Sequence, residues 1–401
     1  MVAPGNGLKV LVCGASIAGP TVGYWLTEYG FDVEIVERSS EVRGGGYPID
    51  LRGSAMDVAE RMGMSEALRE AHLDIGKLTL FDGQGETVLS VNPEQFSGGS
   101  RGHDVEVPRG DLAKLLYDRT RDRCTYYFND HVIALNDRGG EVEVEFASGR
   151  RGCYAYVIGA DGLHSATRQF IFGDEAAFIR HLGFFFVGFT LPNDFGLDRE
   201  QQVFSTVGRM AGLSSVRGRE RITALLTMAL DAMPTSDERD PDVQRERFRA
   251  LFSQDKWHIP RLLEALDQAD DLYLDTVSQI RMPSWSKGRI ALVGDAAYAP
   301  SFVTGQGSSL ALIGAYVLAG ELSRHAEDPQ AAFAAYDAEY RPFAEANQNL
   351  VGKGWQFIPA DVESERQRNE RLRSSGLPAA PAEQKRAIHN GIKIKDYHAD
   401  S

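Results

Sequence analysis

The sequence predicts an α/β fold in which a Rossmann-like dinucleotide-binding framework carries an inserted antiparallel β-sheet domain and ends in a C-terminal helix. Two observations predict it. Residues 9–38 show a buried strand, a glycine turn, a helix and a second strand, which together form a βαβ unit. Residues 173–275 change to long β-runs followed by two helical segments, a pattern typical of an antiparallel sheet with helices beside it.

The glycine turn resembles a dinucleotide-binding fingerprint that lacks its middle glycine. Gly14 permits a sharp turn after the first strand, Gly19 allows the helix to pack closely, and the helix start offers N–H groups to a phosphate. Ser16 occupies the place of the second glycine, where its hydroxyl can donate to a phosphate. Glu37 closes the second strand about 20 residues after the turn, where a carboxylate binds a ribose hydroxyl.

Two other interpretations use the same residues. One is a glycine-rich turn in an unrelated α/β domain. The other is the nucleophile elbow of the α/β-hydrolases, in which Ser16 would be the nucleophile. The hydrolase interpretation is disfavoured because the motif follows the first strand, whereas a hydrolase carries it on a central strand laid down after several others.

Composition limits the function classes. The 401 residues carry 43 Lys and Arg against 57 Asp and Glu, a net charge of −14. Nucleic acids and anionic membranes bind basic surfaces, so we expect neither as the main partner. The first residues lack the pattern of a secretory leader, no apolar stretch is long enough to span a membrane, and the three cysteines show no Cys-x-x-Cys spacing. We therefore expect a cytoplasmic protein with buried thiols and, since the nine histidines form no ligand motif, no metal.

The other helices and strands are predicted from hydrophobic periodicity. Further helices are expected over residues 54–72, from about 111, over 164–172, 243–252 and 259–268, from about 307, and over 329–356. Further strands are expected over residues 78–91 as a hairpin, 126–149 as a hairpin or three-stranded meander, 155–160, 183–190, 202–207, 212–216, 222–230 and 289–294.

These elements divide the chain into domains. The dinucleotide-binding framework is expected at residues 1–72, 103–172 and 276–328, and the inserted β-domain at residues 73–102 and 173–275. A C-terminal helix follows at residues 329–373. Residues 374–401 are rich in Ser, Gly, Pro and Ala and show no amphipathic repeat, so we expect a tail without regular structure.

Three motifs occur in the order and at the spacing of one known family. They are the glycine turn with Glu37, the run VIGADGLHSATR around Asp161, and the run ALVGDAAYAP around Asp295. Together they resemble the flavin-dependent aromatic hydroxylases of the para-hydroxybenzoate hydroxylase type, over about residues 8–350. The loop RGGGYPIDL is similar to that of the tetracycline-inactivating and polyketide-tailoring monooxygenases.

The resemblance implies a function and two cofactors. It implies bound FAD, NADPH or NADH as a transient co-substrate, and hydroxylation of an electron-rich aromatic or polyketide-like molecule with O2 through a flavin hydroperoxide. Because the sequence has a single fingerprint, NADPH has no domain of its own. No side chain is expected to act as a catalytic base, and Pro300, Gly305 and Gln306 are expected near the reactive face of the flavin.

The resemblance also assigns residues to the cofactors. Glu37 would bind the adenosine ribose, Arg109 the ribityl–phosphate linkage and Asp295 a ribityl hydroxyl, while Arg43 would contact NADPH. The complete implied set is Gly14, Ala15, Ser16, Ile17, Ala18, Gly19, Glu37, Arg38, Arg43, Asp50, Arg109, Val132, Asp161, Gly294, Asp295, Pro300, Gly305, Gln306, Gly307 and Ser308.

Phe184, Phe186 and Phe302 are the residues expected to face the substrate. The first two share one face of a strand in the β-insertion, which in this family forms the roof over the flavin. The segment around Phe302 replaces a commoner proline-rich run, and Tyr298 stands where many members have histidine. Because these positions line the path to the flavin, the substrate's identity does not carry over from the family.

Other activities occur on the same fold. One is a flavin-dependent halogenase, since residues 257–260 (WHIP) match half of a halogenase signature, although a helix start with Ile259 and Leu262 packed inward explains them better. A second is a prenyl-chain reductase. A third is a lipid-group carrier without flavin, which the retained Arg109 and Asp295 disfavour. The oligomeric state is left open.

Overall fold

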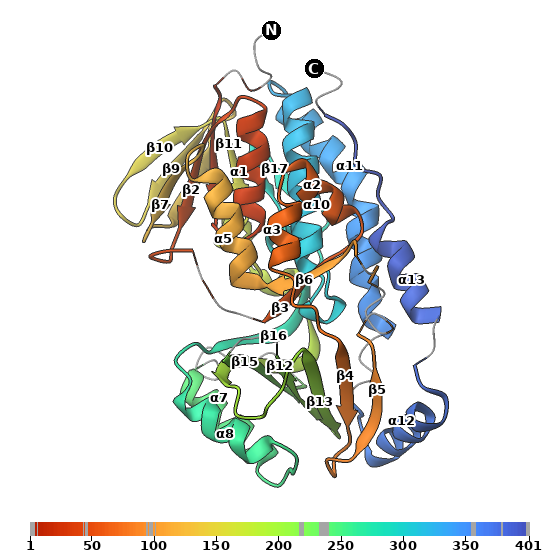
Figure 1. Ribbon diagram of the computed structural model, residues 1–401. Helices are drawn as coiled ribbons and strands as arrows, with labels where there is room; N and C mark the ends of the chain where they lie inside the picture. The colour runs from red at the N-terminus through yellow and green to blue at the C-terminus, as the bar shows by residue number, and fades with distance from the viewer. Residues whose placement is uncertain are drawn as a thin grey trace.

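The computed structural model describes residues 5, 7–42, 44, 47–93, 95, 99–100, 102–215, 220–231, 240–353, 358–377 and 380–397. Figure 1 shows a framework of helices around one sheet and, below it, a second sheet with helices beside it. In spatial order, the framework strands are β17 (Ser286–Lys287), β18 (Ile290–Leu292), β11 (Tyr156–Gly159), β1 (Lys9–Cys13), β2 (Asp32–Glu37) and β7 (Thr125–Phe128). All neighbours are parallel except β17 and β18, so the predicted α/β fold with a Rossmann-like framework is confirmed.

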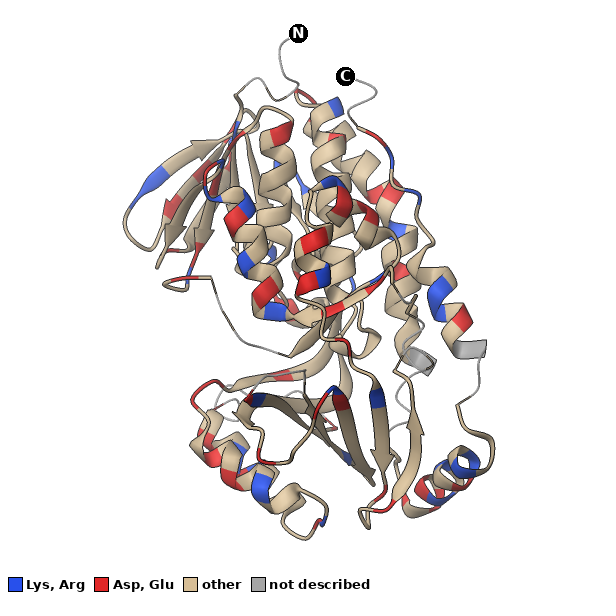
Figure 2. Cartoon of the chain, in the orientation of Figure 1, with Lys and Arg blue, Asp and Glu red and all other residues tan. Residues whose placement is uncertain are grey.

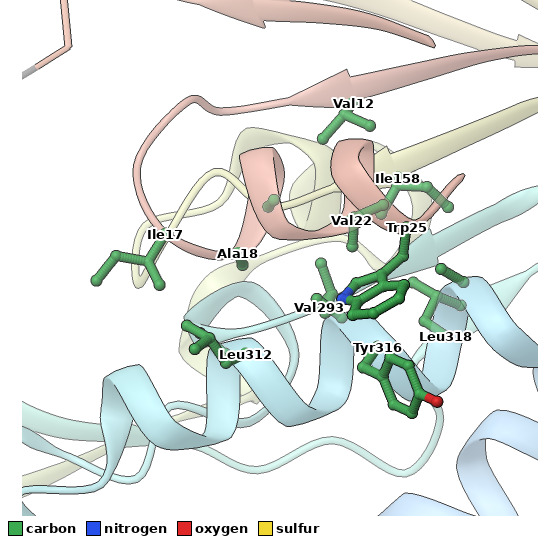
Figure 3. Packing of buried hydrophobic residues seen from close by; sticks show 14 of the residues in the cluster. Val12, Ile17, Ala18, Val22, Trp25, Ile158, Val293, Leu312, Tyr316 and Leu318 are labelled. Atoms are coloured by element: carbon green, nitrogen blue, oxygen red, sulfur yellow. The ribbon is translucent and has the colours of Figure 1, made fainter. Parts of the chain in front are cut away.

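The core of the framework lies between β1 and two long helices. α1 (Ala18–Glu28) packs against α10 (Gly307–Arg324). Trp25 on α1 is 2% exposed, and its ring meets Tyr316 on α10 edge-on at a centroid distance of 4.7 Å. Figure 3 shows this contact, with Val22 beside Trp25. Burial of this large aromatic pair fixes α1 against the helix that later forms part of the site.

The second sheet has seven strands. In spatial order they are β16 (Tyr273–Ile280), β12 (Ile179–Pro192), β15 (Arg221–Ala229), β14 (Arg209–Ser214), β13 (Glu200–Thr206), β4 (Lys77–Phe81) and β5 (Thr87–Val91). Neighbours are antiparallel except for β13 and β4. α7 (Pro241–Phe252) and α8 (Ile259–Gln268) cover one face, where Phe185 packs on Phe248. Residues of the opposite face line the cavity described below.

Shorter elements complete the chain. β3 (Pro48–Leu51) and β6 (Val105–Pro108) form a two-stranded antiparallel ribbon. A three-stranded meander consists of β8 (Val132–Asp137), β9 (Val142–Phe146) and β10 (Arg151–Tyr154). The remaining elements before α10 are α2 (Ser54–Arg61), α3 (Ser65–Glu70), α5 (Arg109–Thr120), α6 (Ala166–Phe172), η1 (Glu175–Ala177), α9 (Asp295–Tyr298) and η3 (Phe302–Thr304).

Three local expectations need correction. The helix expected over residues 54–72 is two helices, because Gly63 adopts a positive φ of 67° between α2 and α3 and ends the first. Within the expected hairpin or meander at 126–149, β7 instead leaves to pair with β2, and only the following strands form the meander. Cys153 is exposed because it lies on the edge strand β10, whereas Cys13 and Cys124 are buried as expected.

The C-terminal region is more structured than expected. The expected helix at 329–373 is α11 (Pro329–Gln348), then η4 (Asn349–Lys353), and after residues outside the described set α12 (Val362–Ser375). Within the expected tail, α13 (Ala380–His389) packs against α11, and Tyr397 is buried against α10. The tail has no amphipathic repeat in its sequence, but Ile392, Ile394 and Tyr397 are buried in the framework core.

Charged side chains of both signs are interspersed along the outer helices α7, α8 and α12 (Figure 2). In the described part of the chain, none of the helices combines the length and apolar character that a bilayer crossing requires.

Candidate cofactor and substrate site

The glycine turn between β1 and α1 is closely packed. Gly14 has a φ of 107°, and a Cβ added there would lie 2.5 Å from the Ala160 carbonyl oxygen. A Cβ added at Gly19 would lie 1.9 Å from the Gly14 carbonyl oxygen. Both positions therefore require glycine. Ile17 caps α1 without a side-chain hydrogen bond, which leaves the first N–H groups of the helix available to an anion.

Glu37 is held beside this turn. Its carboxylate accepts hydrogen bonds from the Ala15 N–H and the Ser39 N–H, each at 2.9 Å. Glu37 and Arg38 line one end of a large cavity that also reaches Val132. The acidic residue that the sequence placed at the end of the second strand therefore does lie at the glycine turn.

Arg109 and Asp295 lie further along the same cavity. Arg109 opens α5, and its Nη1 donates to Ser16 Oγ at 3.4 Å. Asp295 opens α9, and its exposed side chain lines the cavity. Burial raises the pKa of Asp295 to about 6, Asp275 adds to the rise, and Arg109 opposes it. Two opposite charges thus face a space enclosed by protein, an arrangement suited to the polar chain of a bound ligand.

The start of α10 forms the next wall. Gly305 has a φ of 65°, and a Cβ added there would lie 2.7 Å from Asp50 Oδ2. Gly305, Gly307 and Ser308 line the cavity together with Pro300. Gln306, the N-cap residue, makes no side-chain cap, so the first N–H groups of α10 lack that partner.

An aromatic group forms another part of the cavity wall. Phe186 on β12 lies 4.4 Å from Phe302, measured between ring centroids. Tyr47 and Tyr273 are within 6.4 Å of Phe186 by the same measure. All four residues line the cavity.

The structure brings most of the predicted residues to one cavity. Those that line it are Gly14, Ala15, Ser16, Ile17, Ala18, Glu37, Arg38, Asp50, Arg109, Val132, Asp161, Asp295, Pro300, Gly305, Gly307, Ser308, Phe186 and Phe302. Gly19, Gly294, Gln306 and Phe184 are not among the lining residues. Gly19 and Gly294 instead allow close packing, since added Cβ atoms would meet Gly14 O and Ala18 Cβ at 1.9 and 2.9 Å. Arg43 lies outside the described residues.

The Asp161 motif holds the start of α6. Asp161 accepts from Ser165 Oγ at 2.5 Å and from the Thr167 N–H at 2.9 Å. Ser165 caps α6 by accepting a hydrogen bond from the Arg168 N–H. The buried Arg168 side chain donates to the Ala296 carbonyl oxygen at 3.1 Å, which ties this motif to the segment that follows Asp295.

His164 was missed by sequence reasoning. Its Nδ1 lies 2.8 Å from Glu175 Oε1 and its Nε2 lies 3.2 Å from Asp275 Oδ1. Hydrogen bonds to Asp275 and Glu175 raise the pKa of His164 to about 9. His164 therefore links the Asp161 motif to β16 of the second sheet. His164 lies within the run VIGADGLHSATR, which could have marked it as a site residue, but its partner Asp275 lies 111 positions away in the sequence.

Other lining residues missed from sequence are Tyr47, Tyr273, Glu106 and Gln201. Tyr47 lies in the run RGGGYPIDL, just before β3, whereas Tyr273, Glu106 and Gln201 lie on strands whose pairing has no local sign in the sequence. The half-match to the halogenase signature has a structural explanation, since Ile259 and Leu262 are buried in the core between α8 and the sheet. No cluster of three or more His, Cys, Asp and Glu side chains suited to a metal ion occurs among the described residues.

The cavity fits a dinucleotide together with a second molecule. Its volume is about 1540 Å³, larger than the roughly 300–1,000 Å³ typical of a site for one drug-sized ligand. It is lined by the glycine turn, by Arg109 and Asp295, and by the aromatic group of Tyr47, Phe186, Tyr273 and Phe302. The uncapped N-termini of α1 and α10 both border it, and these suit the phosphates and an electron-rich ring edge.

Comparison with known proteins agrees with this geometry. The family described as FAD binding domain matches residues 7–350. A flavin-dependent monooxygenase from an unidentified prokaryote is 39% identical over 85% of this chain and 87% of its own length. A flavin-dependent monooxygenase of Legionella longbeachae is 35% identical over 98% of this chain and 99% of its own.

Solved structures show the same fold. The crystal structure of tetracycline destructase Tet(55) is 33% identical, with a TM-score of 0.84 over 99% of this chain and all of that one. Klebsiella pneumoniae HpxO, solved with FAD and uric acid, is 22% identical with a TM-score of 0.76 over 96% of this chain and 97% of its own, and shares the fold. The predicted family and its FAD cofactor are confirmed: the chain belongs to the FAD-binding-domain family and is a flavin-dependent monooxygenase.

Proposed function

We propose that the protein transfers one oxygen atom from O2 to an electron-rich aromatic or polyketide-like small molecule and consumes NADPH in doing so. The observation that carries the proposal is one cavity that is lined both by the glycine turn of the framework and by aromatic side chains, Phe186 and Tyr273 from the second sheet with Tyr47 and Phe302 from the framework. Bound FAD would supply the redox chemistry by accepting a hydride from NADPH and activating O2. The protein then has to bind FAD and the substrate, orient them towards each other and exclude water.

The chain's own residues suit these tasks. Glu37 is placed to accept from ribose hydroxyls, and the N–H groups at the start of α1 to bind a pyrophosphate. Arg109 and Asp295, which both line the cavity, would hold the polar chain of FAD. The N-terminus of α10 would favour negative charge on the ring system beside it. These assignments support a protein in which the framework binds FAD and the second sheet contributes to binding the substrate.

The substrate class follows from the aromatic end of the cavity. Phe186, Phe302, Tyr47 and Tyr273 provide flat apolar faces against which an aromatic ring can pack. The similarity to tetracycline destructase Tet(55) supports a polyketide-like substrate. NADPH would enter transiently between the framework and the second sheet, because the chain has one dinucleotide fingerprint and FAD takes it.

The proposal is tested by measuring products. Purified protein is incubated with NADPH, isotope-labelled O2 and a panel of phenols, hydroxyanthraquinones and tetracyclines, and products are analysed by mass spectrometry. We expect at least one compound to gain one labelled oxygen atom while NADPH is oxidised. Oxidation of NADPH without labelled product from any compound, or a halogenated product when chloride or bromide is added, would contradict the proposed reaction.

A further inference from the structure

A group of polar side chains lies where the framework meets the second sheet, away from the glycine turn. Glu106 on β6 lies directly opposite Asp50 on β3 in the antiparallel ribbon. Glu106 Oε1 accepts a hydrogen bond from Gln201 Nε2, on β13, at 2.9 Å. Asp50 is paired with Arg52 through Oδ1 and Nη2 at 2.5 Å. The cavity is lined by all four residues, Glu106, Gln201, Asp50 and Arg52. The Glu106 carboxyl of the framework therefore reaches the cavity face of the second sheet.

Burial favours the protonated, neutral form of the Glu106 carboxyl. Burial raises its pKa to about 8 and the neighbouring Asp50 adds to this, while Arg52 and the Gln201 hydrogen bond oppose it. Lys385 on α13 interacts electrostatically with Arg52 and Asp50, and the His72 ring lies within hydrogen-bonding distance of the Glu106 backbone. Because Gln201 donates to Oε1, the proton belongs on Oε2, which has no hydrogen-bond partner in the described part of the chain.

The sheet face next to Gln201 leaves room for a flat molecule. Two neighbouring rows of one face line the cavity there: Gln201, Ser214 and Thr223, then Val203, Gly212 and Leu225. A Cβ added at Gly212 would have no atom nearer than 3.9 Å, so no neighbouring group requires glycine. Glycine inside a strand weakens the strand and commonly marks the close approach of a ligand. Gly212 therefore leaves space that a planar ring can occupy.

We propose that this corner is a substrate subsite for a flat polyphenol or enolised polyketone, whose rings lie over Gly212 while a carbonyl or phenolic oxygen on one edge accepts a hydrogen bond from the neutral Glu106 carboxyl. The inference rests on the proposed function and adds the chemical feature that the substrate must carry. Gln201 positions the carboxyl, and the apolar row beside it excludes water from the bond. A substrate without an oxygen acceptor on that edge leaves a buried polar group unpaired and binds poorly.

The test is equilibrium binding to the purified holoprotein. The probes are tetracycline and 1,8-dihydroxyanthraquinone, followed by tryptophan fluorescence from about pH 6 to about pH 9, a range that spans the ionisation of Glu106. We compare wild type with Glu106→Gln and Glu106→Ala. The control is Glu66→Gln, which makes the same side-chain substitution at an exposed position on α3, packed beside β6 and outside the cavity.

The expected results have a defined pattern. Glu106→Ala binds at least one probe about five- to tenfold more weakly than wild type at neutral pH, because one hydrogen bond is lost. Glu106→Gln keeps an N–H donor and binds within about twofold of wild type at neutral pH. Wild-type affinity falls relative to Glu106→Gln as pH rises through about 8, since the ionised carboxylate can no longer donate. Ionisation of the probe affects wild type and Glu106→Gln equally, so the ratio of their affinities at each pH reports only the ionisation of Glu106.

A second variant fills the space on the sheet. Gly212→Val is expected to weaken binding of the probes by about tenfold or more while FAD content and the thermal midpoint are unchanged or higher. Wild-type affinity in Glu106→Ala, or failure of both probes to bind wild type, would overturn the subsite. Oxygenation by a protein whose probe binding does not depend on Glu106 refutes the subsite and leaves the proposed function intact. Binding that depends on Glu106 in a protein that holds no FAD supports the subsite and contradicts the function.

Discussion

Replacing Gly19 by alanine tests the close approach on which the FAD-binding turn depends. A Cβ at Gly19 would lie 1.9 Å from the Gly14 carbonyl oxygen and 3.0 Å from its carbonyl carbon. Carbon and carbonyl oxygen atoms approach to about 3.3 Å, so the start of α1 would have to move by roughly 1.4 Å. Backbone lies on both sides of the contact, and no side-chain rotation relieves it. The N–H groups that face the cavity would move with the helix.

The packing around α1 sets how much stability and FAD affinity Gly19→Ala should lose. A displaced helix start disturbs fully packed neighbours such as Val22 and Trp25. We expect the free energy of unfolding to fall by about 2–4 kcal/mol, at the upper end for overpacked cores. Loss of two phosphate hydrogen bonds, each worth about 1–1.5 kcal/mol, should weaken FAD binding by about 30-fold or more.

The matched control is Gly23→Ala in the same helix. There an added Cβ would lie 3.0 Å from Cys124 Sγ and from Ile35 Cδ1, the ends of side chains that can shift. Both variants gain about the same helix propensity, roughly 1 kcal/mol over glycine. Thermal unfolding of the apoprotein and titration with FAD, followed by quenching of flavin fluorescence, measure the two effects. A Gly19→Ala protein as stable as Gly23→Ala, with the same FAD affinity, would refute the reasoning.

Three further predictions concern charged residues. Asp295→Ala and Arg109→Ala should each weaken FAD retention about tenfold or more, since each removes a charged partner worth about 1.5–3 kcal/mol; equilibrium dialysis that finds wild-type retention would count against both roles. Arg43 lies outside the described residues, and Arg43→Ala should raise the KM for NADPH about tenfold at unchanged FAD content. The KM is measured by steady-state NADPH oxidation, and an unchanged KM would show that Arg43 does not contact NADPH. His164 has a folded-state pKa raised to about 9, so its ion pairs with Asp275 and Glu175 stabilise the fold fully below the unfolded pKa of about 6.5. That contribution should disappear as pH rises through about 9, and the thermal midpoint of wild type should then converge on that of His164→Asn; a constant gap would contradict it.

The framework was predictable because its signals are local. A buried strand, a turn and an amphipathic helix are written in neighbouring residues, and Gly14, Gly19 and Glu37 fall at fixed spacings within them. The motif around Asp295 is local for the same reason. β7 was assigned to the wrong sheet because alternation of polarity identifies a strand but not its partner. The helix α13 and the buried Tyr397 were missed because tertiary contacts, rather than sequence periodicity, hold them.

The substrate end of the site was predictable only in part. Alternation placed Phe184 and Phe186 on one face of a strand, but of these two only Phe186 lines the cavity, together with its neighbour Phe185. Glu106 reaches the same cavity through its pairing with β3 and its bond to Gln201, which lies 95 positions away in sequence. Such pairings depend on how two sheets meet, and a single sequence carries no local sign of that.

The most direct test of the central claim, that the cavity bordered by the glycine turn, Arg109 and Asp295 holds FAD, is to measure flavin in the purified protein. The protein is denatured, and the released flavin is identified and quantified by chromatography against a standard, with an absorbance spectrum taken beforehand. We predict a yellow protein that releases one non-covalently bound FAD per chain, with less FAD in Asp295→Ala and Arg109→Ala. A colourless protein that takes up no FAD on titration would contradict the account.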